Sequence, residues 1–138
     1  MSRETYQVDP IGSVESPLRD RDAAPRQPDE GAPPAYVVVR PELAEAMADL
    51  RAGDRVVLLT WLHQADRGVR AVHPRSDTSR PLQGVFSTRS PDRPNPIGLH
   101  DVTIVGVEPG RIAVDGLEAV DGTPVVDIKP VLGAPPTR

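Results

Sequence analysis

Short apolar runs separated by turn residues recur along the chain and predict a mainly β protein. Loose alternation of apolar and polar positions predicts a first strand over 6–14, and the run 35–39 predicts a short buried strand. The run 54–62 is apolar at nearly every position, which is typical of a central strand covered on both faces. Further strands are predicted over 68–73, 82–88, 101–108, 111–119 and 123–131.

Two local patterns refine this prediction. The runs 101–108 and 111–119 flank the dipeptide Pro109-Gly110, which predicts a hairpin. One short helix is expected over 40–53, because Pro41 suits a first helical turn and Gly53 suits a helix end. Its apolar positions follow helical spacing: Leu43, Ala46, Met47 and Leu50. About seven or eight strands with one helix predict a small closed or nearly closed β-barrel, and a sandwich is the alternative.

The length of 138 residues fits a single domain spanning 1–138, with tails expected over 1–5 and 132–138. The segment 15–34 has no periodicity and many prolines, so we expect a long functional loop there. No apolar run reaches the length of a membrane span, and the N-terminus has no signal-peptide core. We therefore expect a cytoplasmic protein with no membrane partner.

Composition narrows the chemistry that the chain can support. It contains no cysteine, which excludes disulfides and thiolate metal sites. The three histidines, His63, His73 and His100, have no metal-ligand spacing, so no metal is expected. Neither a GxGxxG motif, a Walker loop nor a nucleophile elbow is present, which disfavours the common nucleotide-binding folds.

Charge is unevenly distributed along the sequence. The net charge of −4 disfavours a generic nucleic-acid binder, which usually has a basic surface. Six arginines nevertheless fall within 67–93, and they form either a local basic face or a set of scattered solvated side chains. Lys129 is the single lysine among sixteen basic residues.

The segment GVFSTRSPDRPNPIGL, residues 84–99, contains three prolines within six positions and cannot be helix interior or central strand. Proline fixes the backbone, so the turn is ordered before any ligand arrives. Three of its side chains can donate to a carboxylate, a phosphate or a base edge: Arg89, Arg93 and Asn95. A stiff connector between strands is an equally good interpretation.

Two further polar clusters stand out in the sequence, one at the end of a predicted strand and one along the face of another. His63 and Gln64 stand at the end of the predicted strand 54–62. Asp127 and Lys129 are two residues apart, so they share one face of the last strand. They form either an exposed polar face or a charged pair that points into a pocket.

Four segments, 25–28, 63–64, 84–99 and 121–130, occur in an order and at a spacing that resemble the TsaA-like, or TrmO, family. The resemblance extends from Ile11 to Pro130. It implies an S-adenosylmethionine-dependent methyltransferase built as a β-barrel homodimer without a Rossmann sheet. The implied reaction methylates the exocyclic amine nitrogen of threonylcarbamoyladenosine in tRNA.

The resemblance also implies the site residues. The implied S-adenosyl-L-methionine site consists of Arg26, Gln27, Pro28, His63, Gln64, Arg89, Leu99, Asp115, Gly116, Leu117 and Glu118. Arg89 is expected to pair with the methionine carboxylate. The implied substrate side consists of Arg93, Asn95, Asp127 and Lys129. Asp127 is expected to be the general base or to orient the amine, and Lys129 to bind a substrate carboxylate or phosphate.

Some features depart from the family pattern. His100 stands where the family usually has a small residue, and Val131 stands where an aromatic often occurs. The second, C-terminal domain of the common bacterial form is not expected within these 138 residues. Two alternatives therefore stay open beside the tRNA methyltransferase. One is a methyltransferase of the same fold acting on a small molecule in secondary metabolism, and the other is a non-catalytic S-adenosylmethionine-binding module.

Overall fold

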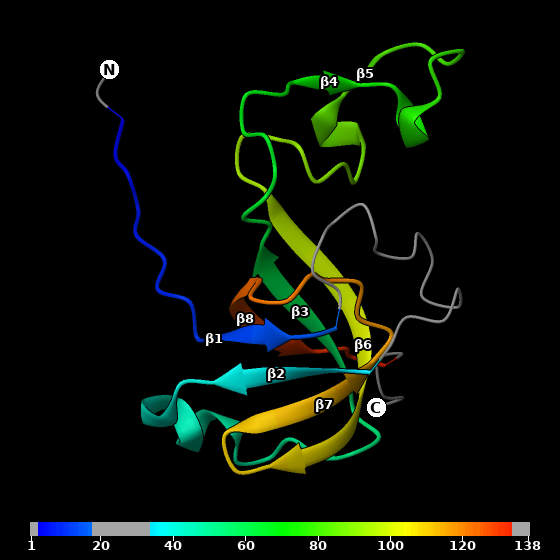
Figure 1. The fold of residues 1–138 in the computed structure, drawn as a ribbon. Helices are drawn as coiled ribbons and strands as arrows, with labels where there is room; N and C mark the ends of the chain where they lie inside the picture. The colour runs from blue at the N-terminus through cyan, green and yellow to red at the C-terminus, as the bar shows by residue number, and fades with distance from the viewer. Residues whose placement is uncertain (1–2, 18–33, 134–138) are drawn as a thin grey trace, which may run out of the picture.

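A computed structural model describes residues 3–17 and 34–133, in which six antiparallel strands close into a barrel (Figure 1). Around the barrel the order is β1-β2-β7-β6-β3-β8, and β8 pairs again with β1. The barrel strands are β1 (Gly12–Glu15), β2 (Ala35–Val39), β3 (Arg55–Trp61), β6 (Ile97–Glu108), β7 (Arg111–Asp115) and β8 (Pro124–Pro130). The predicted fold class, mainly β with a closed barrel, is confirmed, and the sandwich alternative is excluded.

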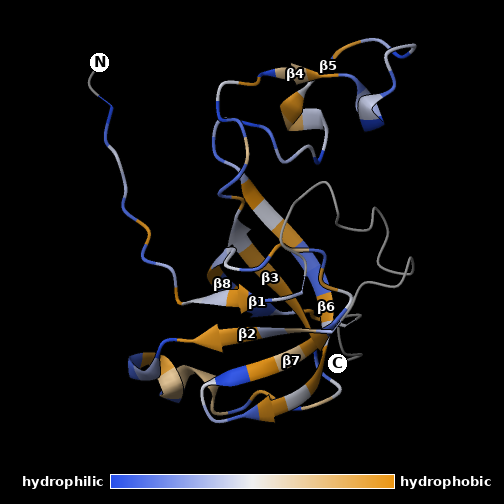
Figure 2. Ribbon diagram, viewed as in Figure 1, coloured by the Kyte–Doolittle hydropathy of each residue, from blue (hydrophilic) through white to orange (hydrophobic). Residues whose placement is uncertain are grey.

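Strict alternation of side chains explains why these segments form a barrel. In β2 the residues Ala35, Val37 and Val39 are buried, while the two residues between them are partly exposed. Along β3 the chain sends Val56, Leu58 and Thr60 inward. Figure 2 shows the resulting apolar bands along the barrel strands. Each fully buried aliphatic side chain stabilises the fold by about 1.5–3 kcal/mol relative to exposure.

Barrel closure also depends on two irregularities in the ladder. The register shifts between Leu59 and Thr60 where β3 pairs with β8, and between Ile104 and Gly106 where β6 pairs with β7. Such bulges bend a strand and increase its twist. Because Val125 and Ile128 both contact the core, the shift leaves Asp127 on the outer surface of the barrel.

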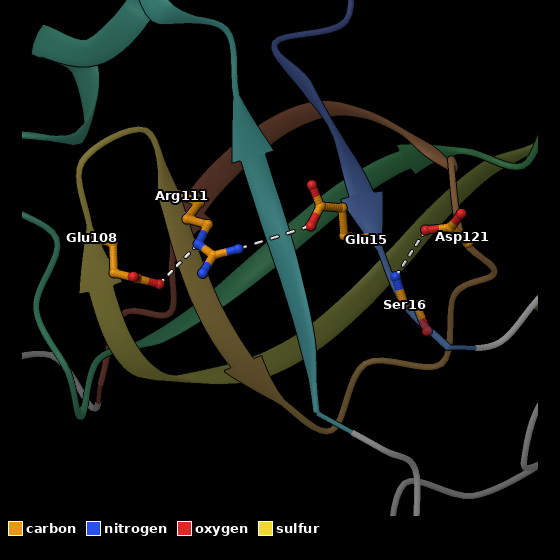
Figure 3. Close-up of polar contacts among 5 residues, drawn as sticks. All are labelled: Glu15, Ser16, Glu108, Arg111 and Asp121. Carbon is orange, nitrogen blue, oxygen red and sulfur yellow. Dashed lines mark hydrogen bonds and ion pairs between the residues drawn. The ribbon is translucent and has the colours of Figure 1, made fainter.

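Polar contacts on the outer surface of the barrel connect β6 and β7 with β1 (Figure 3). Arg111 donates from Nε to Glu108 Oε2 at 2.8 Å, and its Nη1 lies 3.9 Å from Glu15 Oε1. Between these two carboxylates the guanidinium lies over the ring of Tyr36, 4.2 Å from its centroid. Beyond β1, the Ser16 amide donates to Asp121 Oδ1 at 3.0 Å, which ties the end of β1 to the loop before β8.

Residues 62–96, between β3 and β6, project from one end of the barrel and are called the lobe here (Figure 1). The lobe contains a two-stranded sheet of β4 (Ala71–Val72) and β5 (Gln83–Gly84). Two 3₁₀ turns complete it, η4 (Pro74–Ser76) and η5 (Val85–Ser87).

Several predicted elements differ from the structure. The predicted strand 68–73 is two residues long in the structure, and it pairs with β5 and not with the preceding strand β3. The predicted strand 82–88 ends at Gly84, because the next three residues turn into η5. The barrel itself has six strands, and the other two of the eight form the lobe sheet.

The predicted helix is a 3₁₀ helix, η3 (Pro41–Met47), and it ends well before Gly53. Within η3 Met47 is buried and Leu43 is partly buried against the same core, so two apolar side chains hold η3 on the barrel. The predicted loop 15–34 lies mostly outside the described residues. In the described part of the chain, no helix has the length and apolar character that a membrane crossing requires.

We expect Gly12→Ala to destabilise the fold by about 1–3 kcal/mol, the usual cost of overpacking. A Cβ at Gly12 would lie 2.0 Å from the backbone oxygen of Val38, so β1 and β2 would have to separate. Urea unfolding measures the loss. Gly84→Ala is the matched control, because a Cβ there meets nothing within 4 Å. Equal stability of the two variants would contradict the close approach of β1 to β2.

Candidate functional site

A pocket of about 870 Å³ lies between the open end of the barrel and the lobe, and we call it the mouth pocket. Residues of the lobe form one wall, and the segment before β8 together with His100 of β6 forms the other. Four of the predicted cofactor residues line it: His63, Gln64, Arg89 and Glu118. The structure therefore brings together residues from three distant segments of the sequence.

Local backbone structure explains how these side chains reach the pocket. His63 and Gln64 follow β3 directly, where the Leu62 amide donates to the Pro96 oxygen at 2.8 Å and holds the strand end against the proline turn. Glu118 follows Gly116, whose φ of +88° favours glycine. The chain turns at Gly116, buries Leu117 in the barrel core and then presents Glu118 to the pocket.

Two arginines hold the proline-rich segment in shape. The Arg93 guanidinium donates from Nη2 to the backbone oxygens of Val85 and of Thr88, the latter at 2.8 Å. Arg67 Nε donates to the Pro94 oxygen at 2.7 Å, and its Nη2 donates to Asn95 Oδ1 at 3.2 Å. Of the predicted substrate residues, Arg93 therefore donates within the segment, while Asn95 accepts through Oδ1 from Arg67, and neither lines the mouth pocket.

Arg67 is absent from the predicted site, although it is central to this arrangement. Its guanidinium also lies 5.1 Å from the ring centroid of Trp61, the last residue of β3. The same side chain thus connects the barrel strand to the proline turn. An arginine a few residues beyond a strand-ending tryptophan is only a weak signal in sequence.

Arg89 lies between these braced residues and lines the mouth pocket with an exposed side chain. Within residues 3–17 and 34–133, its guanidinium forms no hydrogen bond or ion pair. It follows η5 and is not delivered by a strand, which corrects the expected strand over 82–88. An available guanidinium at a pocket wall is suited to bind a ligand carboxylate with two parallel hydrogen bonds.

His100 lines the mouth pocket, and the predicted site does not include it. On β6 it shares the inward side with Gly98 and Val102, and its Nε2 lies 2.8 Å from Thr60 Oγ1. Gly98 makes room for this pair, because a Cβ there would lie 2.4 Å from Thr60 Oγ1 and 2.7 Å from His100 Nε2. Strand alternation in 97–108 is the signal that could have identified His100 as inward.

Burial lowers the pKa of His100 to about 4, because the charged imidazolium would lose its hydration there. The side chain is therefore neutral at pH 7. A neutral imidazole hydrogen-bonded to Thr60 adds polarity to the mouth pocket without adding positive charge.

The remaining predicted residues lie elsewhere. On the outside of the barrel, Leu59 of β3 pairs with Leu99 on one side and with Asp127 on the other. Lys129 follows on the same side of β8, and its Nζ lies 3.4 Å from Asp127 Oδ2. We call this surface the outer face: Val57, Leu59, Ile97, Leu99, Asp127 and Lys129. None of its residues lines the mouth pocket.

Asp115 is exposed at the end of β7, next to the turn at Gly116. Arg26, Gln27 and Pro28 lie outside the described residues. Among the residues that are described, no group of three or more His, Asp or Glu side chains could hold a metal ion. The roles of all these residues stay predictions.

The burial of His100 has a consequence for acid stability. Between pH 6.5, the ordinary pKa, and pH 4, the unfolded chain binds a proton at this histidine that the folded chain does not bind. We therefore expect the free energy of unfolding to fall as the pH drops through this window, by up to about 3 kcal/mol. Urea unfolding at several pH values measures the effect. His100→Gln should remove this part of the pH dependence, and an unchanged slope would contradict it.

The chain is similar in sequence to proteins that are named for S-adenosyl-L-methionine binding or for methyl transfer. The chain is 42% identical over 120 residues to a probable S-adenosyl-L-methionine-binding protein of Methanothermobacter thermautotrophicus, covering 86% of this chain and 85% of the relative. It is 37% identical over 120 residues to a putative S-adenosylmethionine-dependent methyltransferase, RcsF, of Pseudomonas aeruginosa, covering 83% of this chain and 50% of that protein.

Solved structures superpose on nearly the whole chain. A crystal structure of TrmO from Pseudomonas aeruginosa superposes with a TM-score of 0.75 at 36% identity, covering 95% of this chain and 56% of that chain. A similar probable S-adenosyl-L-methionine-binding protein of Methanocaldococcus jannaschii is 44% identical over 82 residues, which are 56% of this chain and 65% of that protein. The chain thus spans only part of several relatives. Because residues 13–134 match the tRNA-methyltransferase O N-terminal domain, this chain belongs to the TrmO family.

Proposed function

We propose that the chain is an S-adenosyl-L-methionine-dependent N-methyltransferase whose cofactor binds in the mouth pocket. One observation carries this proposal: His63, Gln64, Arg89 and Glu118, from three segments, line a single pocket of about 870 Å³. The names of the relatives, which are S-adenosyl-L-methionine-binding proteins and a putative methyltransferase, support the choice of ligand.

The chemistry of the pocket fits this ligand. Arg89 offers a guanidinium to the methionine carboxylate, and Gln64 can both donate to and accept from an adenine edge. The Glu118 carboxylate suits ribose hydroxyls or an amine. His100 is neutral at pH 7, so it does not repel a positively charged sulfur in the pocket.

When bound, the cofactor supplies an electrophilic methyl group. The protein's own part is to hold the acceptor nitrogen in line with that group and to accept the proton that the nitrogen loses. The rigid proline turn, braced by Arg93 and Arg67, fixes the position of Arg89 and thus of the ligand's methionine end. Positioning of this kind needs neither a metal nor a covalent intermediate.

The proposed methyl acceptor is threonylcarbamoyladenosine in tRNA. The match to the tRNA-methyltransferase O N-terminal domain supports it, although the chain covers 56% of the TrmO chain of Pseudomonas aeruginosa. The experiment is incubation with methyl-labelled cofactor and tRNA from cells that lack the methylated nucleoside, followed by mass spectrometry of the nucleosides. Label in threonylcarbamoyladenosine supports the proposal. Tight cofactor binding without transfer to tRNA would favour a small-molecule methyltransferase or a binding module.

We also propose that the functional unit is a homodimer. Leu99, Asp127 and Lys129 of the predicted site lie on the outer face, away from the mouth pocket of their own copy. A second copy whose outer face covers the mouth would reunite the two halves of the site, with Asp127 as the proposed base. The outer face has apolar side chains to bury, because Ile97 and Leu99 are each 49% exposed.

We expect Arg89→Lys to weaken cofactor binding almost as much as Arg89→Ala. Lysine cannot reproduce two parallel hydrogen bonds to a carboxylate. The loss should be about 1.5–3 kcal/mol, or roughly 10- to 100-fold in Kd, as is typical of hydrogen bonds to charged groups. Calorimetric titration with S-adenosyl-L-methionine measures it, and Arg40→Lys on η3's N-terminal side is the control. A structural role for Arg89 predicts instead an equal loss of melting temperature with and without cofactor.

For the homodimer, we expect Leu99→Glu to convert a dimer into a monomer, since a charge would be buried among apolar side chains. Light scattering with cofactor present measures the mass. Val8→Glu, at a residue 56% exposed in the N-terminal segment, should leave the mass of the dimer unchanged. A monomeric wild-type protein, or a variant that stays dimeric, would contradict an interface on the outer face.

A further inference from the structure

A second hollow opens on the lobe beside the mouth pocket. It has a volume of about 580 Å³ and is lined by Arg70, Gly84, Val85, Phe86, Ser87 and Pro94. We call it the Phe86 notch. Ser87 lines both hollows, so the notch and the mouth pocket adjoin. Its walls are an aromatic ring, a proline ring and an arginine stem, a combination suited to a flat apolar ring.

Phe86, the single phenylalanine of the chain, is highly exposed to solvent. Its side chain is 86% exposed at the tip of η5, whereas its neighbour Val85 is 2% exposed. A ring held this far into solvent contributes little to the stability of its own fold. Exposed aromatic rings next to arginines are the usual stacking platforms for unpaired bases in single-stranded nucleic acid.

The turn that holds Phe86 is rigid. Arg93 donates to the oxygens of Val85 and Thr88, on either side of the ring, and the Val85 amide donates to the Arg70 oxygen at 3.0 Å. On the opposite wall, Arg67 fixes the Pro94 oxygen at 2.7 Å. The backbone that carries the ring is therefore held in place before binding, which lowers the ordering cost.

Charge on the lobe differs in sign from charge on the rest of the chain. Residues 62–96 contain six arginines and three aspartates, so the lobe carries +3 although the chain carries −4. The rest of the chain therefore carries −7. A polyanion is attracted to the lobe and repelled by the barrel, which fixes the side from which it approaches. Arg70, Arg75 and Arg80 are exposed on the lobe.

We propose that the Phe86 notch binds an unpaired base of an RNA strand, next to the nucleotide whose base enters the mouth pocket. The inference rests on the proposed function, since it treats the mouth pocket as the place of methyl transfer. The base stacks on Phe86 and against Pro94, and Arg70 contacts the adjoining phosphate. The notch thus selects for an acceptor that sits in a single-stranded segment, and it distinguishes RNA from a small isolated nucleoside.

The test measures binding of a short single-stranded oligoribonucleotide and of bulk tRNA by fluorescence anisotropy over a range of salt concentrations. Phe86→Ala should weaken both by roughly 5- to 100-fold, the usual effect of removing one stacked base, and leave the salt slope unchanged. Arg70→Gln should weaken binding and reduce the slope of log K against log salt by about 0.7, the contribution of one phosphate on a single strand.

Three controls separate base stacking on Phe86 from indirect effects of the substitution. Phe86→Tyr should retain RNA affinity, because the ring remains. Tyr6→Ala removes an exposed aromatic ring (83% exposed) outside the lobe and should change nothing. Calorimetry should show unaltered S-adenosyl-L-methionine binding in Phe86→Ala, so that loss of RNA binding is not loss of the cofactor site.

The outcomes distinguish failure of the inference from failure of the proposed function. RNA binding that is insensitive to Phe86→Ala overturns the inference, even if the wild-type protein methylates tRNA. A change of oligomeric mass in Phe86→Ala with intact RNA binding also overturns it and assigns the ring to a second copy. RNA binding that depends on Phe86, without methyl transfer by the wild type, supports the notch and contradicts the proposed function.

Discussion

The pairing of β3 with β6 on one edge and β8 on the other is the constraint on which the arrangement of the molecule depends. Alternation along β3 directs Leu58 and Thr60 into the barrel and Val57 and Leu59 to the outer face. A slip of one residue would exchange these two sets. This register places Thr60 within hydrogen-bond distance of His100 in the mouth pocket. It also places Leu99 and Asp127 on the outer face, outside that pocket.

The lobe is built by a different principle from the barrel. Its sheet has only two residues in each strand, and Val85 and Pro96 are its buried residues. Side-chain hydrogen bonds to backbone oxygens replace a core, with Arg93 and Arg67 as the donors. Hydrogen bonds to charged groups stabilise more than neutral ones, which explains why such a segment can use arginine in place of apolar packing.

The sequence predicted the structure well where a short apolar run joins the hydrogen-bonded ladder of the barrel. Strands β2, β3, β7 and β8 follow from short apolar runs, and the hairpin follows from the turn dipeptide Pro109-Gly110 between two such runs. In the lobe, the segments 68–73 and 82–88 have a similar local pattern but pair only with each other, outside the barrel, so each keeps a strand of two residues.

The sequence predicted only part of the candidate site. Family resemblance identified His63, Gln64, Arg89 and Glu118, which one pocket brings together. It could not show that Arg93 already donates within its own segment or that Asn95 Oδ1 accepts from Arg67, because hydrogen-bonding capacity is visible in sequence and its use is not. The register shift before Asp127 is equally hidden, since a bulge depends on closing the barrel and not on local residue type.

Charge and rigidity together assign different tasks to the two parts of the molecule. The mouth pocket combines the neutral imidazole of His100 with two exposed guanidinium groups, Arg75 and Arg89, so it suits a ligand that carries both a positive sulfur and a carboxylate. The adjoining lobe carries the positive charge, on a chain that is otherwise acidic. In the function proposed above, a polyanion contacts the lobe first, and the braced turn at Phe86 aligns its bases with the pocket. In this proposal the affinity for the polyanion comes from the arginines of the lobe, and the alignment of its bases comes from Phe86. A substitution can therefore change one of these properties without the other.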